Sequence, residues 1–155
     1  MSKNRDIVEN LTEYVAVYLG AQLFGLSIER VQDVFIPGKV TAVPLAGPEI
    51  AGLINLRGRI VTAIDMRVRL DLPPRPQGQT LMALGIEQKG EHYGLLVDGV
   101  GEVMSFEAEA CEAKPVNMDA RLARVSSGVV RLEGMLLVIL DVDRILEPAG
   151  TAVAA

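Results

Sequence analysis

Short apolar runs alternate with turn-forming residues along this chain, and the clearest example spans residues 52–69. An apolar run from Leu53 to Leu56 leads into the dipeptide Arg57-Gly58, and a run rich in β-branched residues leads out of it. β-branched residues suit a pleated sheet, and glycine suits a turn position that needs a positive φ. The pattern predicts a β-hairpin with a charged residue, Arg57, at its tip.

Similar runs predict further strands on both sides of this hairpin. The predicted strands are Tyr14–Leu19, Gln22–Leu26, Thr80–Glu87, His92–Val97, Gly99–Phe106, Val125–Leu132 and Met135–Val142, with an extended segment over Val31–Val43. Short helical pieces are expected after Ser27, over Glu49–Leu53 and over Asp143–Leu146, whereas residues 107–122 show no clear period. Many short strands separated by Gly and Pro turns are typical of an all-β barrel or sandwich.

One proline-rich connector interrupts the series of strands. It has the sequence LPPRPQGQ and is the predicted boundary inside the chain. The resulting division has a single domain over 12–147, made of subdomain one at 13–71, a linker at 72–79 and subdomain two at 80–147, with flexible ends at 1–11 and 148–155.

The two halves of the chain resemble each other. FGLSIERVQDV at 24–34 aligns without gaps on YGLLVDGVGEV at 93–103, and NLRGRIVTAIDM at 55–66 aligns on RLEGMLLVILDV at 131–142. Upstream, Tyr14–Leu19 matches the pattern of Leu81–Ile86. Blocks that recur in the same order indicate an internal duplication, and hence two small β units that are packed together because each alone has a thin core.

The duplication separates shared positions from divergent ones. The pairs Gly58/Gly134 and Asp65/Asp141 are identical in both halves, which favours structural turn roles, with the carboxylates bonding turn amides. Arg57 instead stands where the second half has Glu133. A turn arginine can be a solvated charge or a contact residue presented on a rigid hairpin, and the divergence favours the second interpretation.

Composition excludes several classes of function. The net charge is −5, there is no Trp, and Phe and Tyr number three each, so the basic stripe and stacking platform of a nucleic-acid binder are missing. Apolar runs are too short for a membrane helix, so we expect no membrane insertion, and the charged N-terminus does not look like a signal peptide. Cys111 is the only cysteine, which fits a reducing cytoplasm.

The sequence shows no constellation of catalytic or metal-binding residues. His92 has no Cys or His at ligand spacing, and Cys111 lies among glutamates that raise a thiol pKa, so neither predicts a metal, catalytic or cofactor site. Asp65, Asp98 and Asp141 each close an apolar strand; acid–base work by a pair of them is the weaker alternative to a structural role. The remaining candidate site is a surface for an amphipathic partner helix, with Val31, Asp33 and Arg57 as its residues if the fold brings them together.

These segments resemble the CheW-like coupling proteins of bacterial chemotaxis. The resemblance rests on GLINLRGRIVTAIDMR, supported by FGLSIERVQDV before it and by YGLLVDGVGEV and GMLLVILDVDRIL after it, and it covers about residues 12–147. It implies an all-β fold of two five-stranded SH3-like barrels with short helical turns. It also implies a non-enzymatic cytoplasmic adaptor that binds no cofactor and is associated with membrane chemoreceptor arrays.

The resemblance implies two partners and part of one binding site. Members link the cytoplasmic tips of chemoreceptors to the regulatory domain of the histidine kinase CheA. The receptor-facing groove would include Val31, Asp33 and Arg57, with Val100 on its other side, whereas no residue is assigned to the kinase contact. Asp33 departs from the glutamate that is common in the family, which shortens the reach of the charge. The alternative within the family is the equivalent adaptor of a related array that controls twitching motility or development.

Overall fold

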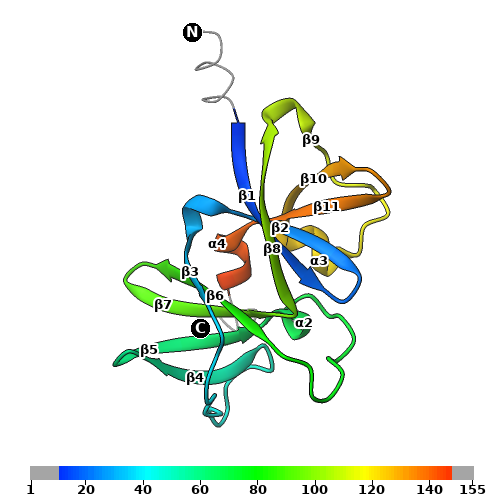
Figure 1. Ribbon diagram of the computed structural model, residues 1–155. Helices are drawn as coiled ribbons and strands as arrows, with labels where there is room; N and C mark the ends of the chain where they lie inside the picture. Colours follow the sequence, from blue (N-terminus) through cyan, green and yellow to red (C-terminus); the bar gives the residue numbers. More distant parts are fainter. Residues whose placement is uncertain (1–10, 148–155) are drawn as a thin grey trace, which may run out of the picture.

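Two β-sheets and a few short helices make up the computed structural model, which describes residues 11–147 (Figure 1). The expected flexible ends at 1–11 and 148–155 lie outside the described residues, apart from Leu11, which begins the first strand. The elements are β1 (Leu11–Leu19), β2 (Gln22–Ser27), η1 (Ile28–Arg30), β3 (Val31–Phe35), β4 (Ile50–Leu56), β5 (Arg59–Asp65), α2 (Met66–Arg69), β6 (Met82–Gln88), β7 (Glu91–Val97), β8 (Gly99–Glu107), η2 (Ala108–Ala110), β9 (Cys111–Glu112), α3 (Ala120–Val125), β10 (Ser126–Leu132), β11 (Met135–Leu140) and α4 (Val142–Leu146). The prediction of an all-β fold with short helical turns is confirmed.

The two sheets do not follow the two halves of the chain. One sheet has the order β8-β1-β2-β11-β10-β9 and the other has the order β3-β6-β7-β5-β4. The β1–β2 hairpin therefore lies with strands of the second half, and the β6–β7 hairpin lies with strands of the first half. The expected subdomains at 13–71 and 80–147 do not correspond to these sheets, because parallel pairings of β2 with β11 and β5 with β7 exchange the hairpins.

The strand registers show that equivalent residues of the two halves pair in the same way. Val138 pairs with Phe24 in one sheet as the equivalent Thr62 pairs with Tyr93 in the other. The β2–β11 pair and the β5–β7 pair thus have the same register, and this supports the alignment of the two repeated blocks. In the upstream block, however, the equivalent of Tyr14 is Ala83 and not Leu81, because Tyr14 pairs with Met104 as Ala83 pairs with Phe35.

Two local expectations differ from the structure. The helix predicted after Pro48 is absent, since Ile50 already begins β4 and Leu53 exchanges both backbone hydrogen bonds with Thr41. Strand pairing on both sides of this segment outweighs the helix-starting tendency of Pro48. The turn after Ser27 is the 3-10 helix η1, but the Ser27 side chain makes no capping hydrogen bond.

A single apolar core joins the sheets. Phe24 and Leu26 from one sheet and Leu84 and Leu95 from the other are fully buried in one cluster, together with Ile145 of α4. Side chains of this size each contribute about 1.5–3 kcal/mol when they are buried, so the interface between the sheets is a main source of stability. Each sheet also has one smaller apolar cluster of its own.

A buried cluster of charges also ties the sheets together. Asp98, whose side chain is 7% exposed, lies between the end of β7 and the start of β8. Its carboxylate accepts hydrogen bonds from the guanidinium groups of Arg67 in α2 and Arg75 in the connector, the latter at 2.9 Å. It also accepts the backbone N–H of Gly20 in the β1–β2 turn at 2.6 Å. Arg67 in turn donates to the carbonyl oxygens of Pro73 and Pro74, so the connector is anchored to the fold.

These contacts decide the charge state of Asp98. Burial alone would raise the pKa of this carboxyl, but hydrogen bonds from Arg67, Gly20 and Arg75 hold its pKa far below the usual range. A carboxyl with a lowered folded-state pKa stabilises the fold above its unfolded value of about 4, and the stabilisation is lost as the pH falls toward the folded-state pKa.

We predict that Asp98→Asn lowers the free energy of unfolding by about 3 kcal/mol at pH 7, because it leaves the buried Arg67 guanidinium without a carboxylate and Arg75 with Asp65 as its only one. Urea unfolding curves measure the change, and the difference from the wild type should shrink as the pH is lowered from 4. The matched control is Asp71→Asn, which removes an exposed pair with Arg121 and should cost less than about 1 kcal/mol. Equal losses for both variants would contradict the assigned role of the cluster.

Candidate functional site

The candidate site begins at the turn of the β4–β5 hairpin. Arg57 and Gly58 both have positive φ, at 53° and 81°, which is the backbone of a type I′ turn. The Asn55 side-chain oxygen accepts the Gly58 N–H at 3.1 Å and closes the turn. Arginine has no intrinsic preference for this left-handed backbone, so the hairpin holds Arg57 in a costly conformation at its tip.

An ion pair connects this turn to the strand opposite. The Arg57 Nη1 lies 3.9 Å from the Asp33 carboxylate on β3, with the two side chains 79% and 40% exposed. Exposed pairs at this distance stabilise a fold little, so the charges remain free to exchange partners. Gly85 on β6 makes room for Asp33, because any Cβ at that position would collide with the carboxylate.

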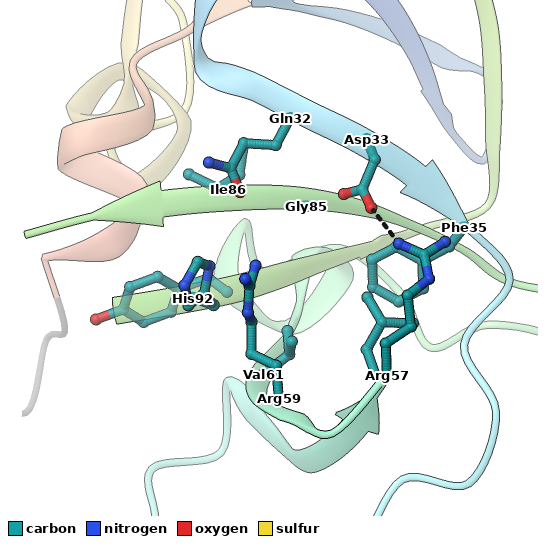
Figure 2. Close-up of a pocket in the computed structure, with 11 residues that line it drawn as sticks. Gln32, Asp33, Phe35, Arg57, Arg59, Val61, Gly85, Ile86 and His92 are labelled. Carbon is teal, nitrogen blue, oxygen red and sulfur yellow. Dashed lines mark ion pairs between the residues drawn. The ribbon is translucent and has the colours of Figure 1, made fainter. Parts of the chain in front are cut away.

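Both residues line a groove of about 360 Å³ across the sheet that contains β3 (Figure 2). Apolar side chains form part of the wall, and polar ones project at its edges, as the sticks in Figure 2 show. The lining residues are Gln32, Asp33, Phe35, Leu56, Arg57, Arg59, Val61, Gly85, Ile86, His92 and Tyr93. An open groove with an apolar wall and charged edges can bind a segment that has both characters.

The structure brings together two of the four residues predicted for the binding site. Arg57 and Asp33 form the ion pair, but Val31 and Val100 do not line the groove. Val31 pairs with Ile86 in one sheet, whereas Val100 pairs with Val17 in the other. Both valines are half-buried and pack against the main core, where they occupy equivalent positions of the duplication.

The groove also contains residues that the sequence analysis did not assign to it. His92 was expected to have no metal or catalytic role, and the structure places it in the groove wall beside Arg59 (Figure 2). Comparison of the two halves could have identified both Arg59 and His92 as candidate residues. Arg59 stands opposite Met135 in the aligned blocks, and His92 stands opposite Leu23, so both are polar in one half alone.

The predicted turn residues divide into two kinds. Asp65 and Asp141 each cap the start of a short helix by accepting a backbone N–H, from Arg67 at 3.0 Å and from Arg144 at 3.3 Å. Gly134 has a φ of 80°, like Gly58, but Glu133 before it has no positive φ. The two equivalent hairpins therefore have different turns, and only the one with Arg57 needs two left-handed residues.

The described residues lack two further kinds of feature. Within 11–147, no group of three or more His, Cys, Asp or Glu side chains could hold a metal ion. No helix of that range is long and apolar enough to cross a membrane. What the geometry offers is an open groove with an apolar wall and charged edges, and the class it defines is a module of two β-sheets with a recognition surface.

Comparison with known proteins identifies the family. Residues 13–149 match the CheW-like domain, which is most of the chain, so the chain belongs to the CheW-like family. It is a non-enzymatic chemotaxis adaptor that interacts with chemoreceptors and with the kinase CheA. The fold is the pair of SH3-like β domains of this family, as the resemblance implied.

Individual relatives agree with this assignment. The chain is 27% identical to chemotaxis protein CheW of Klebsiella aerogenes over 86% of its length and 81% of the relative. It is 25% identical to CheW of Thermotoga maritima, over 87% of each chain. Among solved structures, the scaffolding protein TtCheW of Thermoanaerobacter tengcongensis superposes with a TM-score of 0.78 at 27% identity, covering 90% of this chain and 94% of that one.

We predict that Arg57→Asn leaves the free energy of unfolding unchanged or raises it by up to about 1 kcal/mol. Asparagine tolerates the left-handed backbone that arginine adopts at a cost, and the exposed pair with Asp33 contributes little. Thermal and urea unfolding measure the effect. Gly58→Ala serves as the contrast and should destabilise, because its φ of 81° is strained for any L side chain. A clear loss of stability in Arg57→Asn would mean that the arginine is a structural residue.

Proposed function

We propose that the groove between Arg57 and Asp33 binds the cytoplasmic tip of a chemoreceptor. The observation that carries this proposal is the ion pair itself, which places opposite charges on the two sides of a partly apolar groove. A receptor helix with an apolar stripe and charged flanks complements such a surface. Arg57 supplies several donors in one plane, and its exposure leaves them available to the partner.

Val31 and Val100 extend this proposed contact. Each lies near the start of a strand, β3 for Val31 and β8 for Val100, at a junction where the chain passes from one sheet to the other. Their half-buried side chains can add apolar contact area without any change in the fold. Receptor binding would then involve a charged centre in the groove and an apolar margin at the junction.

The second proposed partner is the regulatory domain of a CheA-type kinase. An adaptor must bind both partners at once, so the kinase contact should lie away from the groove. Large exposed apolar residues outside the groove are compatible with such a contact, among them Ile36 and Leu45, which are 70% and 105% exposed. With both contacts made, the adaptor would be held in the chemoreceptor array at the membrane.

We predict that Arg57→Glu weakens binding to a receptor tip at least about tenfold, because the reversed charge faces Asp33 and repels the partner's carboxylates. Titration calorimetry with a purified receptor-tip fragment measures the affinity, and kinase stimulation in a reconstituted complex measures the consequence. Arg131→Glu makes the same charge change on an exposed strand position of the other sheet and should leave binding intact.

A variant with normal stability, wild-type affinity and full kinase stimulation would show that the groove is not the receptor site. A pull-down with the wild-type chain from its native cytoplasm identifies the receptors and the kinase that it serves. That result also decides between a chemotaxis array and one for twitching motility or development.

A further inference from the structure

Three further polar residues, Gln32, Arg59 and His92, line the groove beside the Arg57–Asp33 pair. Arg59 begins β5, and His92 lies near the start of β7 on the same wall (Figure 2). Within residues 11–147, neither side chain joins an ion pair or donates a hydrogen bond. Gln32 lies above them on β3 and marks the edge of the groove.

Neighbouring carboxylates have other partners. Asp33 pairs with Arg57, and the Glu87 carboxylate accepts a hydrogen bond from the Gln32 amide at 2.8 Å. Glu91 accepts one from the Tyr93 hydroxyl, also at 2.8 Å. Arg59 and His92 are thus the groove donors that remain without an acceptor in the described part of the chain.

The duplication provides an independent comparison. At the equivalent places in the other sheet stand Met135 and Leu23, and Leu23 is buried in an apolar cluster. Met135 is 42% exposed, so the two equivalent positions differ in burial but are both apolar, whereas Arg59 and His92 both carry N–H donors. Neither Arg59 nor His92 is needed to complete the strands, because the equivalent strands form with Met and Leu.

We propose that Arg59 and His92 form an anion-binding subsite that binds a second carboxylate on the partner helix, separate from the acidic group bound by Arg57. The proposal rests on the groove being the receptor site. Its occupant is an amphipathic helix with two acidic residues on one face, since positions three, four or seven residues apart share a face. Charge complementarity favours this occupant, because the free groups of the groove are basic although the chain as a whole carries −5.

The subsite would determine which receptors this adaptor prefers. A helix with an acidic residue only at the Arg57 position would bind, but more weakly than one with both. Each partly exposed contact of this kind changes affinity by a factor of about three to ten, and the effect falls with added salt.

The chain itself supplies the test substitutions. Arg59→Met and His92→Leu introduce the residues of the equivalent positions, so both are expected to fold. With a receptor-tip fragment as the probe, titration calorimetry should show about fivefold weaker binding for each variant and a smaller salt dependence for Arg59→Met. Replacing the acidic residue of the receptor helix that faces Arg59 and His92 by its amide should reduce the affinity of the wild type but not that of the Arg59→Met/His92→Leu double variant.

The outcomes separate the two proposals. Loss of binding in Arg57→Glu together with wild-type affinity in Arg59→Met and His92→Leu would overturn the subsite and leave the receptor site in place. Wild-type affinity in all three variants would overturn the receptor site and the subsite together. Arg131→Ala, which removes one exposed positive charge from the other sheet, should behave like the wild type and controls for net charge.

Discussion

Burial of the Asp98 carboxylate imposes the constraint on which the arrangement of the two sheets depends. A buried charge is tolerated only with close partners, and here they come from the β1–β2 turn, from α2 and from the connector. Asp98 itself lies where the chain leaves one sheet for the other. All four segments must be in place before any of these charges is satisfied, which links the formation of the two sheets to each other. The apolar core supplies most of the driving force for folding, but it tolerates changes in side-chain shape better than the charge cluster does.

Local patterns predicted the hairpins, and the internal repeat predicted two similar units. Neither predicted that the first hairpin of each half pairs with strands of the other half. Alternation of apolar residues identifies a strand without identifying its neighbour, and the deciding pairs join residues as distant as Phe24 and Val138. The helix expected at Glu49–Leu53 failed for the same reason, because pairing with Thr41 is not visible in the local sequence. Asp98 looked like an ordinary residue at a strand end, since its partners Arg67 and Arg75 are separated from it along the chain.

The candidate site was only partly visible in the sequence. Arg57 was identified because the glycine of its turn recurs in the other half whereas its charge does not, and the family motif supported Asp33, which the sequence had already placed with Arg57 on a candidate surface. The left-handed backbone of Arg57 could not be predicted, because a glycine at the following position is compatible with more than one turn type. His92 was examined only for metal or catalytic chemistry, and its place in the groove follows from the pairing of β6 with β7 and of β7 with β5.

The exchanged hairpins also suggest how such a molecule arises. Each half of the chain contains a hairpin that completes the sheet of the other half, so a single half has an open sheet and an unmatched hairpin. Two identical copies of a half could satisfy each other only as an intertwined homodimer. The proline-rich connector then corresponds to the point where two such chains became one. Once they were joined, the two sites of a symmetric ancestor could evolve separately, which a homodimer cannot do because every substitution appears in both copies.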